Sequence, residues 1–512
     1  MATSSKPADE SSRPYDALLN DQDFDWMVSD AKFSADTRTN FYDRSLTSRR
    51  YALVGMACSG IVTLANHGVF GVTGTHLTVH AYNFNNPLPL KGEILALALN
   101  FIVTLCTESI GLVHGISLHS ALASESRLRF NANLRLLTAA RGWYNPNGTL
   151  FNGISAVLLI ISYSSASVVV CLDILPSHWV LAIAGFPLLV LGIALLLQVI
   201  ITLSAMRAIK TLTWSSSPFD LTAALVYHTQ LTPATLRCMH CVSDLDTYGG
   251  PAKPSEIQPS AWHAHPSIRK VMIFLWVIVA ACAGWAALIT YISHKNSFAI
   301  PMTTKTWSFS PNESSSFIRY YVPGVNLWIW ILLFVNMAVI QGPLTLGLHC
   351  SELIANVIRD ERQWRCATEK KGLRTATNSV KTTFTHPICL VLFVAKPFLH
   401  WMFGLSFQIY NDIFDMTIQR LSIWNLCIAL FIFACFFTFV ALRRPRGPQP
   451  AAYGHLQTLA NLVDEWSPVM WWGHKEDGIP YCHAGTSDHP LPDVKMDCVY
   501  AGSGAGPLVP FS

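Results

Sequence analysis

The sequence predicts an all-α, polytopic transmembrane helix bundle, and three observations carry this prediction. The 512 residues are 51% hydrophobic and only 13% charged, with a mean hydropathy of +0.35, which is not typical of a soluble globular chain. The apolar residues fall in discrete runs of about 20, long enough to cross a hydrocarbon core ~30 Å thick. The basic residues collect in alternate segments between these runs.

Eight apolar runs are candidate membrane spans. The first, second and seventh runs contain polar residues but keep the necessary length. We therefore predict about eight spans within residues 51–442. The eight runs are 51–73, 94–118, 154–172, 179–205, 271–293, 324–347, 388–408 and 422–442.

The distribution of Lys and Arg predicts the orientation of the bundle. With an even number of spans, both termini share one side, and the segments on that side hold 29 of the 35 basic residues. The positive-inside rule places that side in the cytoplasm. Residues 1–50 are then a cytoplasmic, partly disordered segment, and residues 443–512 are a cytoplasmic tail. The net charge of +4 follows from this topology and requires no nucleic-acid partner.

Two of the predicted spans continue beyond the membrane. The stretches "GISLHSALASESRLRFNANLRLL" (115–137) and "TLGLHCSELIANVIRDERQWR" (345–365) have apolar residues every three or four positions with charged residues between them. This periodicity predicts amphipathic helices that extend the second and sixth spans into the cytoplasm.

Glu108 and Lys396 are the two ionisable residues that lie deepest in predicted spans. A charge within a span costs ~2.5–3.5 kcal/mol on insertion scales and therefore points to a function. Each residue lies about eight or nine positions from the cytoplasmic end of its span, or ~12–13 Å at 1.5 Å per residue. Because pairing lowers the cost of burying both charges, we expect the two side chains to meet.

Further polar residues extend this pair into a predicted intramembrane pocket. Asn100 and Thr104 precede Glu108 at four-residue steps, so all three share one helix face that should point into the bundle. Asn336 has nearly the depth of Glu108, and His400 lies about one turn beyond Lys396. The pocket would bind a proton or a small polar solute. A static pair that fixes helix register, and two groups that never meet, stay open as alternatives. The pocket residues are Glu108, Lys396, Asn336, Asn100, Thr104 and His400.

Cysteine and histidine residues give no strong metal signal. The segment 206–270 contains "CMHC" and "WHAH", in principle a zinc site, but their separation matches no standard finger. We expect reduced thiols here, with no metal and no cofactor. None of the 13 cysteines falls in a predicted outer loop, and the Asn312 sequon lies in the longest of these loops, where it can be glycosylated.

The tail contains "LVDEWSPVMWWGHKEDG", in which Trp466, Trp471 and Trp472 follow a basic anchor at 443–446. Clustered tryptophans near basic residues favour packing on the membrane interface or on the cytoplasmic helices. We expect a folded cytoplasmic cap, with docking of a cytoplasmic protein partner as the alternative.

Three stretches resemble signature segments of a group of large, uncharacterised fungal polytopic membrane proteins. They are 345–365, "KPFLHWMFG" (396–404) and "LVDEWSPVMWWGHKEDGIPYCHAGTSDHPL" (462–491). The resemblance covers most of the chain from the second span onward and implies a fungal source and a shared topology. That group has no assigned activity, so the resemblance supplies no catalytic residue.

Three function classes remain: a transporter, a non-transporting scaffold or receptor-like protein, and a membrane enzyme. The intramembrane charges favour a transporter of protons or small polar solutes, and the cytoplasmic helices favour a non-transporting scaffold or receptor-like protein. The sequence contains no phosphate-binding Gly-rich loop, no HExxH and no GxSxG, and its short cytoplasmic segments leave little room for a catalytic domain. A membrane enzyme is therefore the least favoured of the three classes. The lipid bilayer is the one certain partner, in the plasma membrane or an endomembrane.

Overall fold

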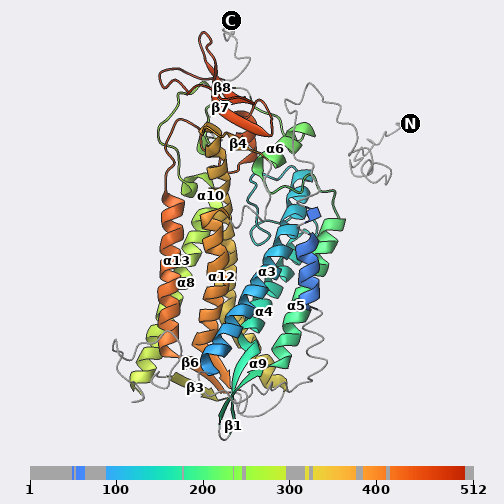
Figure 1. Ribbon diagram of the computed structural model, residues 1–512, viewed down its shortest axis with the longest axis vertical. Coiled ribbons are helices and arrows are strands. Elements are labelled where there is room, and N and C mark those ends of the chain that lie inside the picture. The colour runs from blue at the N-terminus through green and yellow to red at the C-terminus, as the bar shows by residue number, and fades with distance from the viewer. Residues whose placement is uncertain are drawn as a thin grey trace, which may run out of the picture.

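The computed structural model is an elongated helix bundle with a small folded cap at one end and a β-sheet at the other (Figure 1). We call these the cap end and the sheet end. The protein is mostly helical, which confirms the all-α class. The structure describes residues 49–50, 53–63, 88–175, 178–234, 236–244, 250–295, 317–321, 327–375, 385–410 and 415–501.

Six helices in the described part of the chain are long and apolar enough to cross a membrane. They correspond to the second, third, fourth, fifth, seventh and eighth predicted spans, and the chain is a multi-pass integral membrane protein. The six helices are α3 (Leu88–Ser124), α4 (Thr149–Val169), α5 (Gly185–Arg207), α8 (Pro266–Lys295), α12 (Pro387–Ser406) and α13 (Arg420–Leu442).

The other two predicted spans are described only in part. A helix covers Leu53–Thr63 within the predicted first span, and the remainder of that span lies outside the described residues. The predicted sixth span corresponds to α9 (Leu327–Cys350). The count of eight spans and the side of the termini stay predictions, and Asn312 lies outside the described residues.

A five-stranded sheet lies at the sheet end, and the sequence analysis did not anticipate it. Its order is β2-β1-β5-β6-β3, with β1 and β2 forming an antiparallel hairpin. The third predicted span therefore ends earlier than expected, because α4 stops at Val169. The fourth begins later than expected, because α5 starts at Gly185. The intervening "VCLDIL" and "HWVLAI" are apolar, and hydropathy does not separate short apolar strands from helix ends. The strands are β1 (Val170–Leu175), β2 (His178–Ile183), β3 (Phe317–Tyr321), β5 (Phe407–Tyr410) and β6 (Asp415–Gln419).

The cap is built from the segments that connect helices at the cap end, together with residues 443–501. Its core contains the side chains of Trp364, Trp466 and Trp472, all buried. Trp466 and Trp472 therefore stabilise the cap from inside and do not form a docking surface. The cap elements are α6 (Pro218–Tyr227), α7 (Ala261–Ala264), α10 (Glu352–Arg365), β4 (Leu373–Arg374), α14 (Leu456–Leu462), β7 (Val469–Glu476) and β8 (His483–Ser487).

Helix α10 joins the cap to the bundle, as the periodicity of 345–365 predicts. Its buried acids accept hydrogen bonds from other segments: Asp360 from Asn131 Nδ2 at 2.9 Å, and Glu361 from the backbone N–H of Tyr453 at 2.9 Å. The indole of Trp364 donates to the Pro450 carbonyl at 2.8 Å. Buried polar groups require such partners, so the charged stretch "RDERQWR" serves architecture.

The predicted helical extension of the second span is wrong beyond Ser124. Helix α3 ends there, and residues 125–148 form an irregular loop that lies against α4 and α10. Ser126 has φ = 55°, and Asn131 uses its amide to bond Asp360 rather than its own backbone. The loop brings Arg135 back toward the bundle.

Candidate functional site

The Lys396 side chain of α12 is only 1% exposed and lies among four elements of the bundle. Its ammonium donates to Oε1 of Glu108 on α3 and to Oε1 of Glu352 at the start of α10. Nδ1 of His349, near the end of α9, lies 3.4 Å from the same nitrogen. These four residues form the charged cluster. The equal depth of Glu108 and Lys396 in their predicted spans led us to expect that these two side chains meet, and the structure brings them together.

The charged cluster carries more acid than base. His349 Nδ1 lies 2.7 Å from Glu352 Oε1, so its N–H donates to that carboxylate. The other nitrogen, Nε2, is buried with no partner among the described residues. One ammonium faces two carboxylates, which leaves one net negative charge while His349 is neutral. Glu108, Glu352 and His349 have the donor types of a metal site, but the Lys396 ammonium lies among them.

A buried polar network continues from the charged cluster toward the sheet end. The hydroxyl of Tyr163 on α4 lies 3.1 Å from the hydroxyls of Thr104 and Thr107. Its ring stacks on His400 with centroids 3.9 Å apart. His400 Nδ1 accepts from Gln341 Nε2 at 2.9 Å. His400 Nε2 and Gln341 Oε1 are buried without partners among the described residues.

Two residues of the predicted pocket lie apart from this network. Asn100 is buried, but its amide donates to the Ala96 carbonyl of its own helix at 2.9 Å. Asn336 is exposed on the outer face of α9, so it does not line a pocket with Glu108. Gln341 on the same helix faces the core. Five residues at ~3.6 per turn rotate a side chain by about 140°, which accounts for the difference.

Sequence reasoning missed several members of the site. His349 and Glu352 are three residues apart in a continuing helical pattern, and that spacing alone places them on one face. Tyr163 and Gln341 are isolated polar residues in apolar or serine-rich helices, where no pattern singles them out. Arg135 was placed on a helix that does not form.

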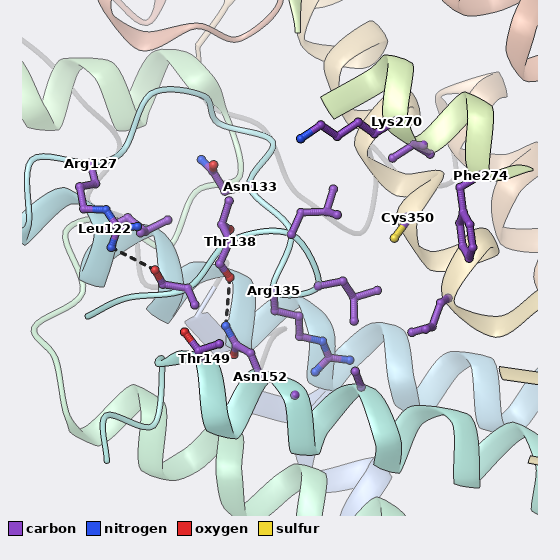
Figure 2. A pocket seen from close by; sticks show the side chains of 17 residues that line it. Leu122, Arg127, Asn133, Arg135, Thr138, Thr149, Asn152, Lys270, Phe274 and Cys350 are labelled. Atoms are coloured by element: carbon purple, nitrogen blue, oxygen red, sulfur yellow. Dashed lines mark hydrogen bonds between the residues drawn. The ribbon is translucent and has the colours of Figure 1, made fainter. Parts of the chain in front are cut away.

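A cavity of about 760 Å³ lies at the cap end of the bundle, between the 125–148 loop, α4, α8 and α9. Figure 2 shows Arg135 of the 125–148 loop and Lys270 of α8 among the side chains that line it. Asn133 and Asn152 add polar groups, and no acidic residue is among those that line the cavity within the described chain. A lining with cations and no acids favours anions.

Arg135 connects the cavity to the charged cluster. Its Nη1 is buried and has no hydrogen-bond partner among the described residues. Burial lowers the pKa of this guanidinium, whereas the nearby carboxylates of Glu352 and Glu108 raise it. Arg127, also at the cavity, is instead bonded to Glu125 at 2.8 Å. Arg135 is thus a cation that faces the cavity while it interacts electrostatically with both acids of the charged cluster.

The cysteines and histidines of 206–270 have separate partners. The Cys241 thiol donates to Asp244 Oδ2 at 2.9 Å, and burial raises its pKa to about 11, with the Asp244 carboxylate adding to the effect. His240 Nε2 lies 2.7 Å from the Gly250 carbonyl. His263 Nδ1 lies 3.0 Å from the Ser260 hydroxyl. This placement does not assemble the zinc site considered from the sequence.

No family model, no curated protein and no solved structure matches this chain. The resemblance to fungal membrane proteins therefore stays a prediction. Any statement about activity has to rest on the charged cluster and the cavity beside it.

Proposed function

We propose that this membrane protein is a transporter that moves a small anion together with a proton. The observation that carries the proposal is the charge arrangement across the charged cluster and the cavity. Two cations, Lys396 and Arg135, interact with two carboxylates, Glu108 and Glu352. Of these four residues, only Arg135 lines the cavity. A ligand bound there can therefore change the balance between the positive and negative charges.

The cavity supports an anionic solute. A guanidinium with an unpartnered N–H can donate charge-assisted hydrogen bonds to carboxylate or phosphate oxygens. Lys270 of α8 supplies a second positive charge (Figure 2). The volume of about 760 Å³ lies in the usual range of small-molecule sites, roughly 300–1,000 Å³. Inorganic phosphate, a phosphate ester or a small carboxylate fits this chemistry.

Proton coupling follows from electrostatics. An anion on Arg135 cancels the positive charge that the Glu108 and Glu352 carboxylates experience, and the cluster is left with an excess negative charge. A proton on His349 Nε2, or on one of the carboxylates, restores neutrality. By linkage, a bound proton must then strengthen anion binding by the same factor. The predicted direction is therefore symport.

The polar network toward the sheet end supports a path for the proton. Three buried atoms of this network, His349 Nε2, His400 Nε2 and Gln341 Oε1, have no partner among the described residues and are open to a further hydrogen bond. Chains of histidine and acidic side chains are typical of proton relays within membranes.

Reconstituted vesicles test the proposal. Purified protein is incorporated into liposomes that contain a pH-sensitive dye, and an inward gradient of inorganic phosphate or succinate is applied. We expect internal acidification that depends on the anion, abolished by Arg135→Gln and by Glu108→Gln. Asn336→Ala serves as the matched control and should keep the wild-type rate. Folded wild-type protein that gives the same signal as empty vesicles with both anions would reject transport and favour the scaffold interpretation.

A further inference from the structure

A second group of side chains with metal-binding chemistry lies in the cap, far from the charged cluster. His474 is in β7, Asp477 and Cys482 lie in the turn between β7 and β8, and Cys498 lies near the end of the described chain. Their spacing along the chain matches no recognised metal motif, because the fourth residue is 16 positions beyond the third. The fold brings the first three together and pairs the backbone next to Cys498 with Cys482.

The distances match a zinc coordination sphere. His474 Nε2 lies 3.2 Å from Asp477 Oδ1, and Cys482 Sγ lies 3.7 Å from the same oxygen. Ligand atoms of these three residues all lie within 4.8 Å of one another. Around tetrahedral zinc, with bonds of about 2.0–2.3 Å, neighbouring ligand atoms are about 3.3–3.8 Å apart. Both contacts are close to that range.

Cys498 is positioned to complete the set. Backbone hydrogen bonds join Cys482 N to the Val499 carbonyl at 2.9 Å and Ala501 N to the Cys482 carbonyl at 3.1 Å. This pairing sets Cys498 beside Cys482, so its thiol is available as a fourth ligand. Both thiols are free.

The histidine is held in an orientation that suits metal binding. His474 Nδ1 lies 2.9 Å from the hydroxyl of Tyr500, whose side chain is fully buried. With Nδ1–H donated to that oxygen, Nε2 keeps a lone pair directed at Asp477. A second hydrogen bond of this kind is typical of metal-ligating histidines, because it fixes the tautomer and the ring orientation.

We propose that His474, Asp477, Cys482 and Cys498 bind one zinc ion that fastens the β7–β8 turn to the C-terminal segment. Binding requires both thiols as thiolates, so two protons are released to solvent and no electrons are exchanged. The ammonium of Lys495 supplies the positive charge beside the Asp477 carboxylate, with Nζ 2.6 and 2.7 Å from its two oxygens. Its side chain is half exposed and can turn into solvent when the metal enters. The site does not depend on the proposed transport.

The metal content of the full-length protein in detergent tests the assignment. After equilibration with zinc and removal of the excess, we expect about one zinc per chain by mass spectrometry. Cys482→Ser and Cys498→Ser should each weaken zinc binding at least tenfold. Cys366→Ser, which alters a thiol bonded to the Arg362 carbonyl on α10, is the matched control and should retain the metal.

Two surface substitutions keep the test valid if a cysteine variant misfolds. Asp477 and Lys495 are largely exposed, so changes there leave the cap folded. Asp477→Asn should weaken zinc binding, and Lys495→Ala should tighten it, because a competing ammonium is removed. Wild-type protein without zinc after saturation, unchanged zinc in Asp477→Asn, or a Cys482–Cys498 disulfide in protein alkylated at lysis would overturn the assignment.

Discussion

The bundle and the cap each contain a buried group of charged side chains, and the two groups differ in their balance of acids and bases. In the cap, Asp464 accepts from His483 at 2.8 Å, from Lys475 at 3.0 Å and from the Thr486 backbone N–H at 2.6 Å. In the bundle, Lys396 bonds two carboxylates. One histidine nitrogen in each group, His349 Nε2 in the bundle and His483 Nδ1 in the cap, is buried without a partner among the described residues.

This difference distinguishes the Asp464 group, which stabilises the fold, from the charged cluster, which we propose takes part in transport. The Asp464 group leaves its carboxylate fully hydrogen-bonded, which is what a fold-stabilising ion pair in a protein interior requires. The charged cluster of the bundle has one carboxylate more than it has ammonium groups, so it can gain a proton without losing its existing bonds. We therefore expect substitutions in the cap to change stability alone, and substitutions in the bundle to change both stability and proton movement.

The largest effect is expected for Lys396→Met. The change removes the ammonium that joins Glu108 and Glu352 and leaves two carboxylates side by side. Removing one partner of a buried ion pair costs about 3–5 kcal/mol, so thermal unfolding in detergent should occur at a clearly lower temperature. Adding Glu108→Gln and Glu352→Gln to the same chain should recover part of the loss. A melting temperature equal to wild type would show that the charged cluster does not hold the helices together.

Asp464→Asn should have a smaller effect, confined to the cap. The amide keeps an acceptor for Thr486 but loses the charge that His483 and Lys475 bind, which costs about 2 kcal/mol. Limited proteolysis should cut residues 443–501 faster, while anion-driven acidification of vesicles at pH 7 stays at the wild-type rate. Asp488→Asn changes an exposed acid of the same cap and is the control. Loss of transport in Asp464→Asn would contradict the separation between the two regions.

The stability of the cap should depend on pH through His483 and Asp464. Burial by itself lowers the pKa of His483, but hydrogen bonds to Asp464 and Cys238 outweigh it and raise the pKa to about 9. Burial raises the pKa of Asp464, and its hydrogen bonds, chiefly from His483 and Lys475, bring it down to about 2. The stabilisation from His483 is complete below its unfolded pKa of about 6.5 and is lost as the pH rises through 9. The stabilisation from Asp464 is complete above about pH 4 and is lost as the pH falls toward 2.

Tryptophan fluorescence during unfolding measures this profile, because Trp466 and Trp472 are buried in the cap. We expect greatest cap stability between about pH 4 and pH 6.5. His483→Gln should flatten the decline between pH 7 and pH 9. A decline of the same slope in His483→Gln would assign the alkaline transition to another group.

Asn336→Ala should have the smallest effect. Its side chain is exposed on α9 and lies outside the polar network, so stability should change by no more than about 0.5 kcal/mol. Vesicle acidification should be unaffected. A tenfold loss of transport would place Asn336 on the solute path and would show that the two faces of α9 act together.

The sequence by itself determined the class of this protein and the composition of its charged centre. Hydropathy and basic-residue distribution report how each segment partitions between lipid and water, and this is a property of the segment alone. Glu108 and Lys396 could be matched in depth because helical rise converts residue number into distance. The amphipathic continuation at 345–365 was readable for the same reason.

Only the tertiary structure decided which polar faces meet. Helix rotation separates Asn336 from Gln341, and the periodicity of α9 does not reveal which face packs inward. The 125–148 loop carries Arg135 to the cavity through contacts of Asn131 and Asn152 with distant segments. His474 meets Tyr500 because β7 and the C-terminal segment pack together. Such encounters depend on long-range packing, which local hydropathy and spacing do not encode.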